Sequence, residues 1–231
     1  MSKLIYVADD EKNIRNLIQS FLKKEGYQVE AFDTGDKLYA AFEEKASNLV
    51  ILDVMMPGNS GFIICTKLRA ISNVPIIILT ARDTEEDYIS GLSLGSDDYF
   101  TKPFSPVKLT MRVKALFRRV DMDTASENKN SSGEISYANV TIHPGKHTAY
   151  CNGTEIGLTG TEFNLLAYLF ENHDRAVSRE ELLSSIWGYD SDVESRATDD
   201  TVKRLRRKLT NSQVSIDTVW GFGFRVREAT E

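Results

Sequence analysis

Short apolar runs alternate with amphipathic segments through the first 120 residues, and this alternation limits the fold more than any other feature of the chain. In the segment 13–25, for example, Ile14, Ile18 and Leu22 keep a helical spacing. The expected strands are 4–8, 28–32, 49–52, 76–79 and 99–100, and the expected helices lie near 13–25, 34–45, 61–71, 84–94 and 106–119. Alternating strands and helices predict an α/β doubly wound domain with a five-stranded parallel sheet.

The chain changes character after residue 120. Residues 121–133 read DMDTASENKNSSG, a stretch rich in Ser, Asn and acids without a helical or strand period. This composition predicts a flexible linker. It divides the chain into domains at 1–120 and 134–231, each large enough to form its own core.

The second domain begins with short strand-like pieces and ends with a hairpin pattern. The turn at Asn152–Gly153 separates two of these pieces and is a strong hairpin signal. Expected strands are 140–142, 148–151 and 155–158, expected helices lie near 160–172, 179–187 and 197–209, and the closing hairpin is 214–226. Three helices followed by a hairpin whose turn contains Gly221 and Gly223 predict an α+β winged helix-turn-helix domain.

The overall charge argues against nucleic-acid binding, but its distribution does not. The 231 residues include 28 Lys and Arg against 34 Asp and Glu, a net charge of −6, whereas DNA-binding domains usually carry a basic footprint. Residues 196–208 alone hold six bases and two acids, and binding depends on the local field.

The apolar runs are too short for a membrane span. With no leader pattern and two separated cysteines, Cys65 and Cys151, we expect a cytoplasmic protein with reduced thiols.

Five functional groups fall at the ends of the expected strands. Asp9 and Asp10 follow the first strand, and Asp53 ends the third. Neighbouring carboxylates repel one another unless a cation lies between them, and Mg²⁺ prefers such oxygen ligands. Thr80 and Lys102 add a hydroxyl and an ammonium at the ends of the fourth and fifth strands. This set suits phosphoryl transfer to a nucleophilic carboxylate, although each acid taken alone could serve as a helix cap or a turn residue.

The motifs around these groups resemble a bacterial response-regulator receiver domain. They are DDE at 9–11, LDVMMPGNSG at 52–61, LTAR at 79–82 and DDYFTKPF at 97–104. The resemblance implies that Asp53 accepts a phosphoryl group from a sensor histidine kinase. It also implies that Mg²⁺ is held by Asp9, Asp10, Asp53 and the backbone carbonyl of Met55. Thr80 and Lys102 would contact the phosphoryl oxygens, Tyr99 would be the aromatic switch, and Lys102–Pro103 would be a cis peptide.

The basic segment 196–209 has the pattern of a recognition helix. At 100° per residue, Thr198, Val202 and Leu205 share a face with Leu209, while Asp200, Lys203, Arg204 and Arg207 are expected on the opposite face. Such a helix fits the major groove, where Arg reads guanine and Lys contacts phosphates. An ordinary solvated face with pairs such as Asp199–Lys203 is the alternative for an isolated helix.

The second domain as a whole is similar to the effector domain of OmpR/PhoB-type regulators. The matching pieces are LTGTEFNLL at 158–166, SREELLSSIWG at 178–188, DDTVKRLRRKL at 199–209 and VWGFGFRV at 219–226. The resemblance implies binding of double-stranded promoter DNA, with 187–195 as a contact for RNA polymerase. The expected DNA-binding residues are Arg196, Thr198, Asp200, Thr201, Lys203, Arg204, Arg207, Lys208 and Arg225 in the wing. Phe224 stands where the family usually has Tyr.

The same resemblance implies a homodimer through the fourth helix, fifth strand and fifth helix of the receiver. The pairs Asp98–Arg112 and Asp97–Arg119 stand in matching positions. Two other pairs depart from the pattern, with Tyr88 opposite Lys108 and Ser93 opposite Lys114. Since surface pairs contribute only about 0–1 kcal/mol each, we expect a dimer of modest affinity that phosphorylation or DNA strengthens.

The favoured interpretation is a phosphorylation-regulated transcription factor of a two-component system rather than an enzyme. One alternative is a constitutively dimeric regulator that acts without phosphorylation. A phosphatase or mutase is disfavoured because Met55 occupies the position where those enzymes carry a second acid. A signalling module without DNA is disfavoured by the basic helix and the wing.

Overall fold

Five parallel strands form the sheet of the first unit, in the order β2-β1-β3-β4-β5. The computed structural model describes residues 2–81, 95–126, 133–188 and 197–229, with backbone only for 119–126. The strands are β1 (Leu4–Ala8), β2 (Gln28–Phe32), β3 (Leu49–Asp53), β4 (Ile76–Thr80) and β5 (Asp98–Thr101). Every residue of β1, β3 and β4 is buried, as expected for strands covered on both faces.

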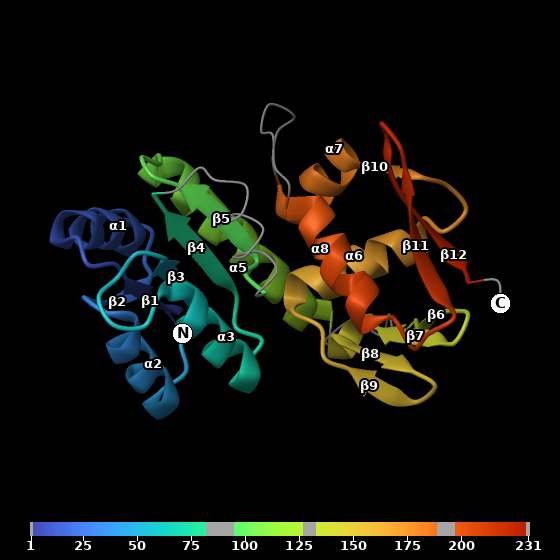
Figure 1. Cartoon of the computed structure of the whole chain (residues 1–231), viewed down its shortest axis with the longest axis horizontal. Coiled ribbons are helices and arrows are strands. Elements are labelled where there is room, and N and C mark those ends of the chain that lie inside the picture. Colours follow the sequence, from blue (N-terminus) through green and yellow to red (C-terminus); the bar gives the residue numbers. More distant parts are fainter. Residues whose placement is uncertain (1, 82–94, 127–132, 189–196, 230–231) are drawn as a thin grey trace. The chain divides into compact units, whose positions relative to one another are not determined.

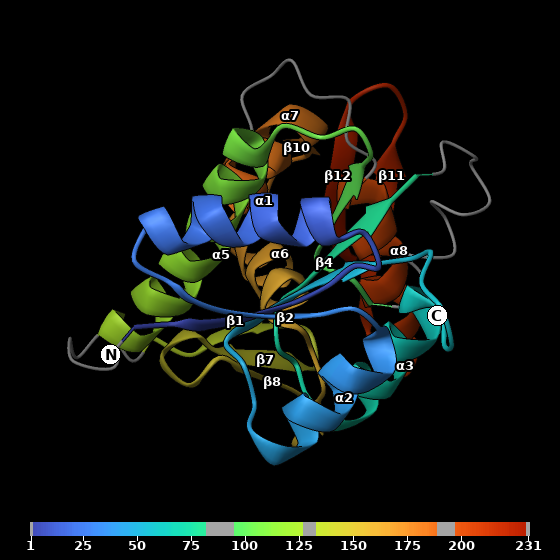
Figure 2. The same ribbon diagram turned by 90° about the vertical axis from the view of Figure 1, so that its left-hand side faces the viewer.

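Helices cover both faces of this sheet, so the doubly wound fold is confirmed. The helices are α1 (Lys12–Lys24), α2 (Gly35–Glu44), α3 (Gly61–Ile71) and α5 (Pro106–Ser126). Figures 1 and 2 show α1 and α5 on one face and α2 and α3 on the other. Their apolar sides supply buried residues such as Ile18, Leu38 and Leu68. The helix expected at 84–94 lies outside the described residues.

Helix α5 is longer than the sequence predicts. It continues through Ser126, so the expectation of irregular structure from residue 121 is wrong for 121–126. Extending an existing helix adds a hydrogen bond for each residue fixed and avoids the cost of nucleation, which lets a polar stretch remain helical. The chain divides into two compact units, Met1–Lys114 and Ala115–Glu231, at a point inside this helix. The domain limits 1–120 and 134–231 stay predictions.

The second unit contains two small antiparallel sheets. One has the order β6-β7-β8-β9 and the other the order β10-β12-β11. Their strands are β6 (Ile135–Tyr137), β7 (Val140–His143), β8 (Thr148–Cys151), β9 (Thr154–Ile156), β10 (Val177–Ser178), β11 (Val214–Val219) and β12 (Gly223–Glu228), and the short helix η1 (Pro144–Lys146) joins β7 to β8. Asn152 and Gly153, both with positive φ, turn the β8–β9 hairpin as predicted.

Three helical segments pack between these sheets and complete the predicted winged helix-turn-helix. They are α6 (Gly160–Glu171), α7 (Arg179–Leu182), which continues into the π-helical turn η2 (Leu183–Trp187), and α8 (Ala197–Lys208). Thr159 and Glu162 form a capping box at the start of α6. The core gathers around the fully buried Phe170, Trp187 and Phe224.

No helix in the described ranges combines the length and apolar character needed to cross a bilayer. Cys65 is buried and Cys151 is partly buried, and neither forms a disulfide within the described residues.

Candidate functional sites

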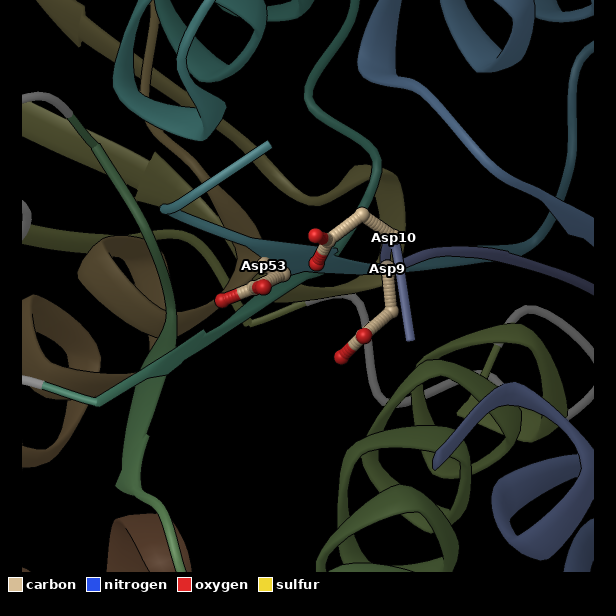
Figure 3. Close-up of side chains that lie close together, drawn as sticks. All are labelled: Asp9, Asp10 and Asp53. Atoms are coloured by element: carbon tan, nitrogen blue, oxygen red, sulfur yellow. The ribbon is translucent and has the colours of Figure 1, made fainter. Parts of the chain in front are cut away.

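Three carboxylates gather at the carboxyl-terminal edge of the parallel sheet. Asp9 and Asp10 directly follow β1, and Asp53 is the last residue of β3. The register of these neighbouring strands pairs Ala8 with Leu52, which brings Asp9 and Asp53 side by side. One oxygen from each carboxylate lies within 4.8 Å of the others, and Figure 3 shows the three side chains grouped together. The predicted convergence is confirmed.

Lys102 joins this group from the end of β5. Its Nζ lies 2.8 Å from Oδ2 of Asp9 and 3.0 Å from Oδ2 of Asp53, and its side chain is only 11% exposed. Its backbone amide donates to the carbonyl of Thr80 at 2.6 Å, which fixes the end of β5 beside the end of β4. The expected cis peptide between Lys102 and Pro103 is present. The ammonium thus balances part of the carboxylate charge.

Burial dominates the electrostatics of the two inner carboxylates. It raises the pKa of Asp53 to about 6; the Lys102 ammonium opposes this rise, and the Asp9 charge adds to it. Burial also raises the pKa of Asp9, against the hydrogen bond and charge of Lys102. Opposite charges therefore lower the cost of keeping both carboxylates ionised, and a further cation would do the same.

The donor set fits a magnesium ion. Oδ1 of Asp53 is buried and receives no hydrogen bond from any described residue, so a lone pair is free for another ligand. Asp10 is exposed, which leaves a path from solvent. Hard carboxylate oxygens in a site with room for water suit Mg²⁺. Met55 lies two residues beyond β3 with an exposed side chain, and its carbonyl stays a predicted ligand.

The two predicted switch residues lie on adjacent strands near the pocket. Thr80 ends β4 and is fully buried. Tyr99 lies in β5, where it is half-buried and packs against the receiver core. The register pairs Ile78 with Tyr99. Their proposed movement on phosphorylation stays a prediction.

Gly61 allows the chain to return to the phosphoacceptor candidate after the β3–α3 loop. A Cβ at this position would overlap the backbone carbonyl of Asp53 and crowd the Cα of Val54. The Gly61 amide donates to the Val54 carbonyl at 3.0 Å. The first residue of α3 therefore braces the backbone that carries Asp53.

Helix α8 exposes fewer of its predicted DNA contacts than expected. Lys203 and Arg207 are exposed, as predicted. Arg204 is buried, with Nε 3.0 Å from Oε1 of Glu162 and one terminal nitrogen 3.1 Å from Oγ1 of Thr201. The prediction that Arg204 projects from the outer face is therefore wrong. Its guanidinium turns inward because Glu162 offers a buried carboxylate.

Two threonines of α8 are also unavailable at its surface. Thr198 is fully buried, and Thr201 is 1% exposed and donates to the Ala197 carbonyl at 2.7 Å. This burial disfavours their expected DNA contacts, which stay predictions. Asp200 is half-buried in the first turn. Arg196 lies outside the described residues.

Two basic residues near the end of α8 are held by neighbours. Lys208 Nζ lies 2.6 Å from Oε2 of Glu162 and donates to the Gly157 carbonyl at 2.6 Å, so its ammonium is partly neutralised. Arg206, which the sequence analysis did not single out, donates to the Ile216 carbonyl at 2.7 Å and to Oγ1 of Thr218 at 2.9 Å. Arg206 fastens α8 to β11, a contact that no helical pattern indicates.

The wing presents aromatic as well as basic groups. Phe224 is buried, with the Arg179 guanidinium 4.8 Å and the Arg206 guanidinium 6.0 Å from its ring centre. Arg225 is half-buried, and its Nε receives no partner from the described part of the chain. At the turn, Trp220 is 92% exposed and Phe222 is 47% exposed. Sequence reasoning missed this pair, although aromatics on both sides of Gly221 were visible.

Two acids predicted to lie in the dimer interface form ion pairs within the receiver. Asp97 Oδ2 lies 2.7 Å from a terminal nitrogen of Arg69 and accepts from the Ile76 amide at 2.9 Å. Asp98 pairs with Arg112, and both are buried. Both acids therefore have partners within the receiver, and their expected role in a dimer stays a prediction.

The other expected interface positions are only partly described. Lys114 pairs with Glu25 at 2.6 Å, and Lys108 is exposed. Tyr88, Ser93 and the side chain of Arg119 lie outside the description.

Comparisons with known proteins agree with both halves. Residues 5–114 match the family described as response regulator receiver domain, and residues 153–226 match the family described as transcriptional regulatory protein, C terminal. A structure described as a RitR mutant is 27% identical, with 98% of this chain and 100% of that chain covered and a TM-score of 0.74.

Two further solved structures align over nearly the whole chain. DrrB of Thermotoga maritima, described as an OmpR/PhoB homolog, is 32% identical, with 97% of this chain and 99% of that chain covered and a TM-score of 0.52. A structure described as a novel family of redox sensors in the streptococci, evolved from two-component response regulators, is 27% identical, with 98% and 100% covered and a TM-score of 0.51. With its acidic pocket and its winged helix, the chain belongs to the OmpR/PhoB-type response regulators, which are transcription factors rather than enzymes.

Proposed function

We propose that Asp53 accepts a phosphoryl group from a cognate sensor histidine kinase and that this modification controls promoter binding. A carboxylate oxygen of Asp53 attacks the phosphorus of the kinase phosphohistidine. The P–N bond breaks, an acyl phosphate forms, and the imidazole leaves. The observation that carries the proposal is the buried Asp53 carboxylate, with Lys102 at 3.0 Å and a free Oδ1.

Charge neutralisation is the main task of the surrounding residues. Lys102 already lies beside Asp53 and would stabilise the negative charge on the transferred group. Asp9, Asp10, Asp53 and the Met55 carbonyl would hold Mg²⁺, which supplies further positive charge to the phosphoryl oxygens. Thr80 would bind a phosphoryl oxygen, and Tyr99 would follow its movement.

The new charge would shift the receiver toward a form that dimerises through the helix expected at 84–94, β5 and α5. Two copies would then present two winged helices to adjacent half-sites of double-stranded DNA in the cytoplasm. Lys203 and Arg207 on α8 and Arg225 in the wing are the proposed contacts. The segment 187–195 stays a proposed contact for RNA polymerase.

Phosphorylation of the full chain by acetyl phosphate and Mg²⁺ tests the first step. We expect mass spectrometry to show the gain of one phosphoryl group, lost in Asp53→Asn and slowed in Lys102→Ala. Mobility-shift assays with duplexes enriched from a random library should show tighter binding after phosphorylation. Arg207→Ala should weaken that binding, and a chain that binds no enriched duplex would refute the transcription role.

A regulator that acts without phosphorylation is the second candidate. The matched structure described as belonging to redox sensors evolved from response regulators motivates it. The intact acid group at Asp9, Asp10 and Asp53 favours the first proposal. Equal dimerisation and DNA binding by wild type and Asp53→Asn, with or without acetyl phosphate, would favour the second.

A further inference from the structure

The loop between β3 and α3 is held from outside by one carboxylate of α2. Oδ1 of Asp36 accepts from the side-chain amide of Asn59 at 2.6 Å, and Oδ2 accepts from its backbone amide at 3.2 Å. These hydrogen bonds lower the pKa of Asp36, so the carboxylate stays ionised at neutral pH. A single side chain therefore grips both the backbone and the side chain of Asn59.

Two glycines in the surrounding backbone leave room for the hydrogen bonds between Asp36 and Asn59. Gly58 has a φ of +85°, and a Cβ there would lie 2.8 Å from Oδ2 of Asp36. At the start of α2, a Cβ on Gly35 would lie 2.6 Å from Cγ1 of Ile64 and 3.1 Å from Cε of Met56. The absence of side chains at both glycines lets α2 approach the loop closely.

The β3–α3 loop is short and begins at Asp53, the phosphoacceptor candidate. It leaves the sheet at Asp53, passes Met55 and returns at Gly61, whose missing Cβ lets it contact the Asp53 backbone. The loop is thus fixed at both ends by β3 and α3, and near its outer turn by the Asp36–Asn59 contact. The Met55 carbonyl lies between these fixed points in the sequence.

We propose that Asp36 is a positioning residue that holds the β3–α3 loop, through Asn59, in the conformation that presents the Met55 carbonyl to the metal site. The proposal rests on the proposed function, because it requires a magnesium-dependent pocket. Asp36 acts only through the loop. Its loss should therefore weaken metal binding and leave the reaction at saturating metal nearly unchanged.

Asp33 provides a matched control for the loss of charge. It is an exposed acid three residues before Asp36, and it pairs with Lys37 at 2.7 Å rather than with the loop. Asp33→Ala and Asp36→Ala remove the same charge from the same region. A difference in Mg²⁺ affinity between the two variants therefore measures the effect of the Asp36–Asn59 hydrogen bonds, rather than the long-range field of one carboxylate.

Calorimetric titration of Mg²⁺ into the full chain is the primary test. One or two hydrogen bonds correspond to an increase of about three- to tenfold in the dissociation constant for Asp36→Ala, with Asp33→Ala unchanged. Asn59→Ala keeps the backbone bond and should give a smaller increase, and the double variant should be no worse than Asp36→Ala. Asp36→Asn, which keeps an acceptor for the Asn59 side chain, should be intermediate.

The rate of phosphorylation by acetyl phosphate at varied Mg²⁺ supplies the second readout. We expect Asp36→Ala to need more metal for half its maximal rate while the maximal rate stays near wild type. Equal metal affinity in Asp36→Ala and wild type would overturn the proposal, as would equal losses in Asp33→Ala and Asp36→Ala. A wild-type chain that binds no Mg²⁺ or accepts no phosphoryl group would instead overturn the proposed function.

Discussion

Arg204 Nε lies 3.0 Å from Oε1 of Glu162, and both side chains are buried between α8 and α6. This pair joins α8 to α6, the first helix of the second unit. Glu162 also accepts from the backbone amide of Thr159, so the same carboxylate caps α6. The positive charge of Arg204 therefore stabilises the fold of the second unit by pairing with Glu162.

Arg204→Ala should destabilise the effector domain by about 3 kcal/mol, because it leaves a buried carboxylate short of its partner. Arg207→Ala, three residues along and exposed, should leave stability close to wild type and weaken DNA binding. Urea unfolding and mobility-shift assays on both variants measure the contrast. A stable Arg204→Ala chain with selectively lost DNA binding would contradict the structural role.

The same pair predicts how stability depends on pH. Burial alone would raise the pKa of Glu162, but the charges of Arg204 and Lys208 outweigh burial and hold it below its usual value. The stabilisation is therefore complete above the ordinary glutamate pKa of 4.5 and is lost as pH falls through the lower folded-state pKa. Glu162→Gln, which can still cap α6, should be less stable at pH 7 and should lose this acid-dependent slope in urea unfolding between pH 3 and 6.

Gly61→Ala should damage the pocket without changing any charged group. Its Cβ would overlap the Asp53 carbonyl, so α3 must move away from β3 at a cost of about 1–3 kcal/mol. We expect a lower melting temperature and slower phosphorylation of Asp53 by acetyl phosphate. Gly157→Ala is the control, because no described atom lies within 4 Å of its added Cβ; equal behaviour of the two variants would refute the close contact.

Trp220 offers a direct report on the wing. The chain has two tryptophans; Trp187 is fully buried, and Trp220 is 92% exposed. Iodide should quench Trp220 emission in the free chain, and a bound duplex should shield it if the wing contacts DNA. Trp220→Phe should remove the quenchable signal. Binding seen by mobility shift without any change in Trp220 emission would place the wing turn away from DNA.

Local sequence patterns were sufficient for the sheet and the acidic pocket, because both depend on strand order and on strand ends. Asp9 and Asp53 had to meet once β1 and β3 were neighbours. The burial of Arg204 could not be predicted in this way, since its partner Glu162 is 42 residues away and helical spacing describes only one helix. The pairing of Asp97 with Arg69 could not be predicted for the same reason, because Arg69 comes from a separate helix. The two-residue strand β10 is too short to show a period.

For protein engineering, α8 has exposed positions that can be varied and buried positions that should be kept. The buried ones include Thr198, Thr201 and Arg204. A library meant to change the DNA sequence read by this regulator should vary exposed positions such as Lys203 and Arg207 and keep the three buried side chains. Exchange of the whole helix with that of another regulator would separate Arg204 from the Glu162 that accommodates it. A transfer of DNA specificity between regulators would therefore have to include residues of α6 as well as those of α8.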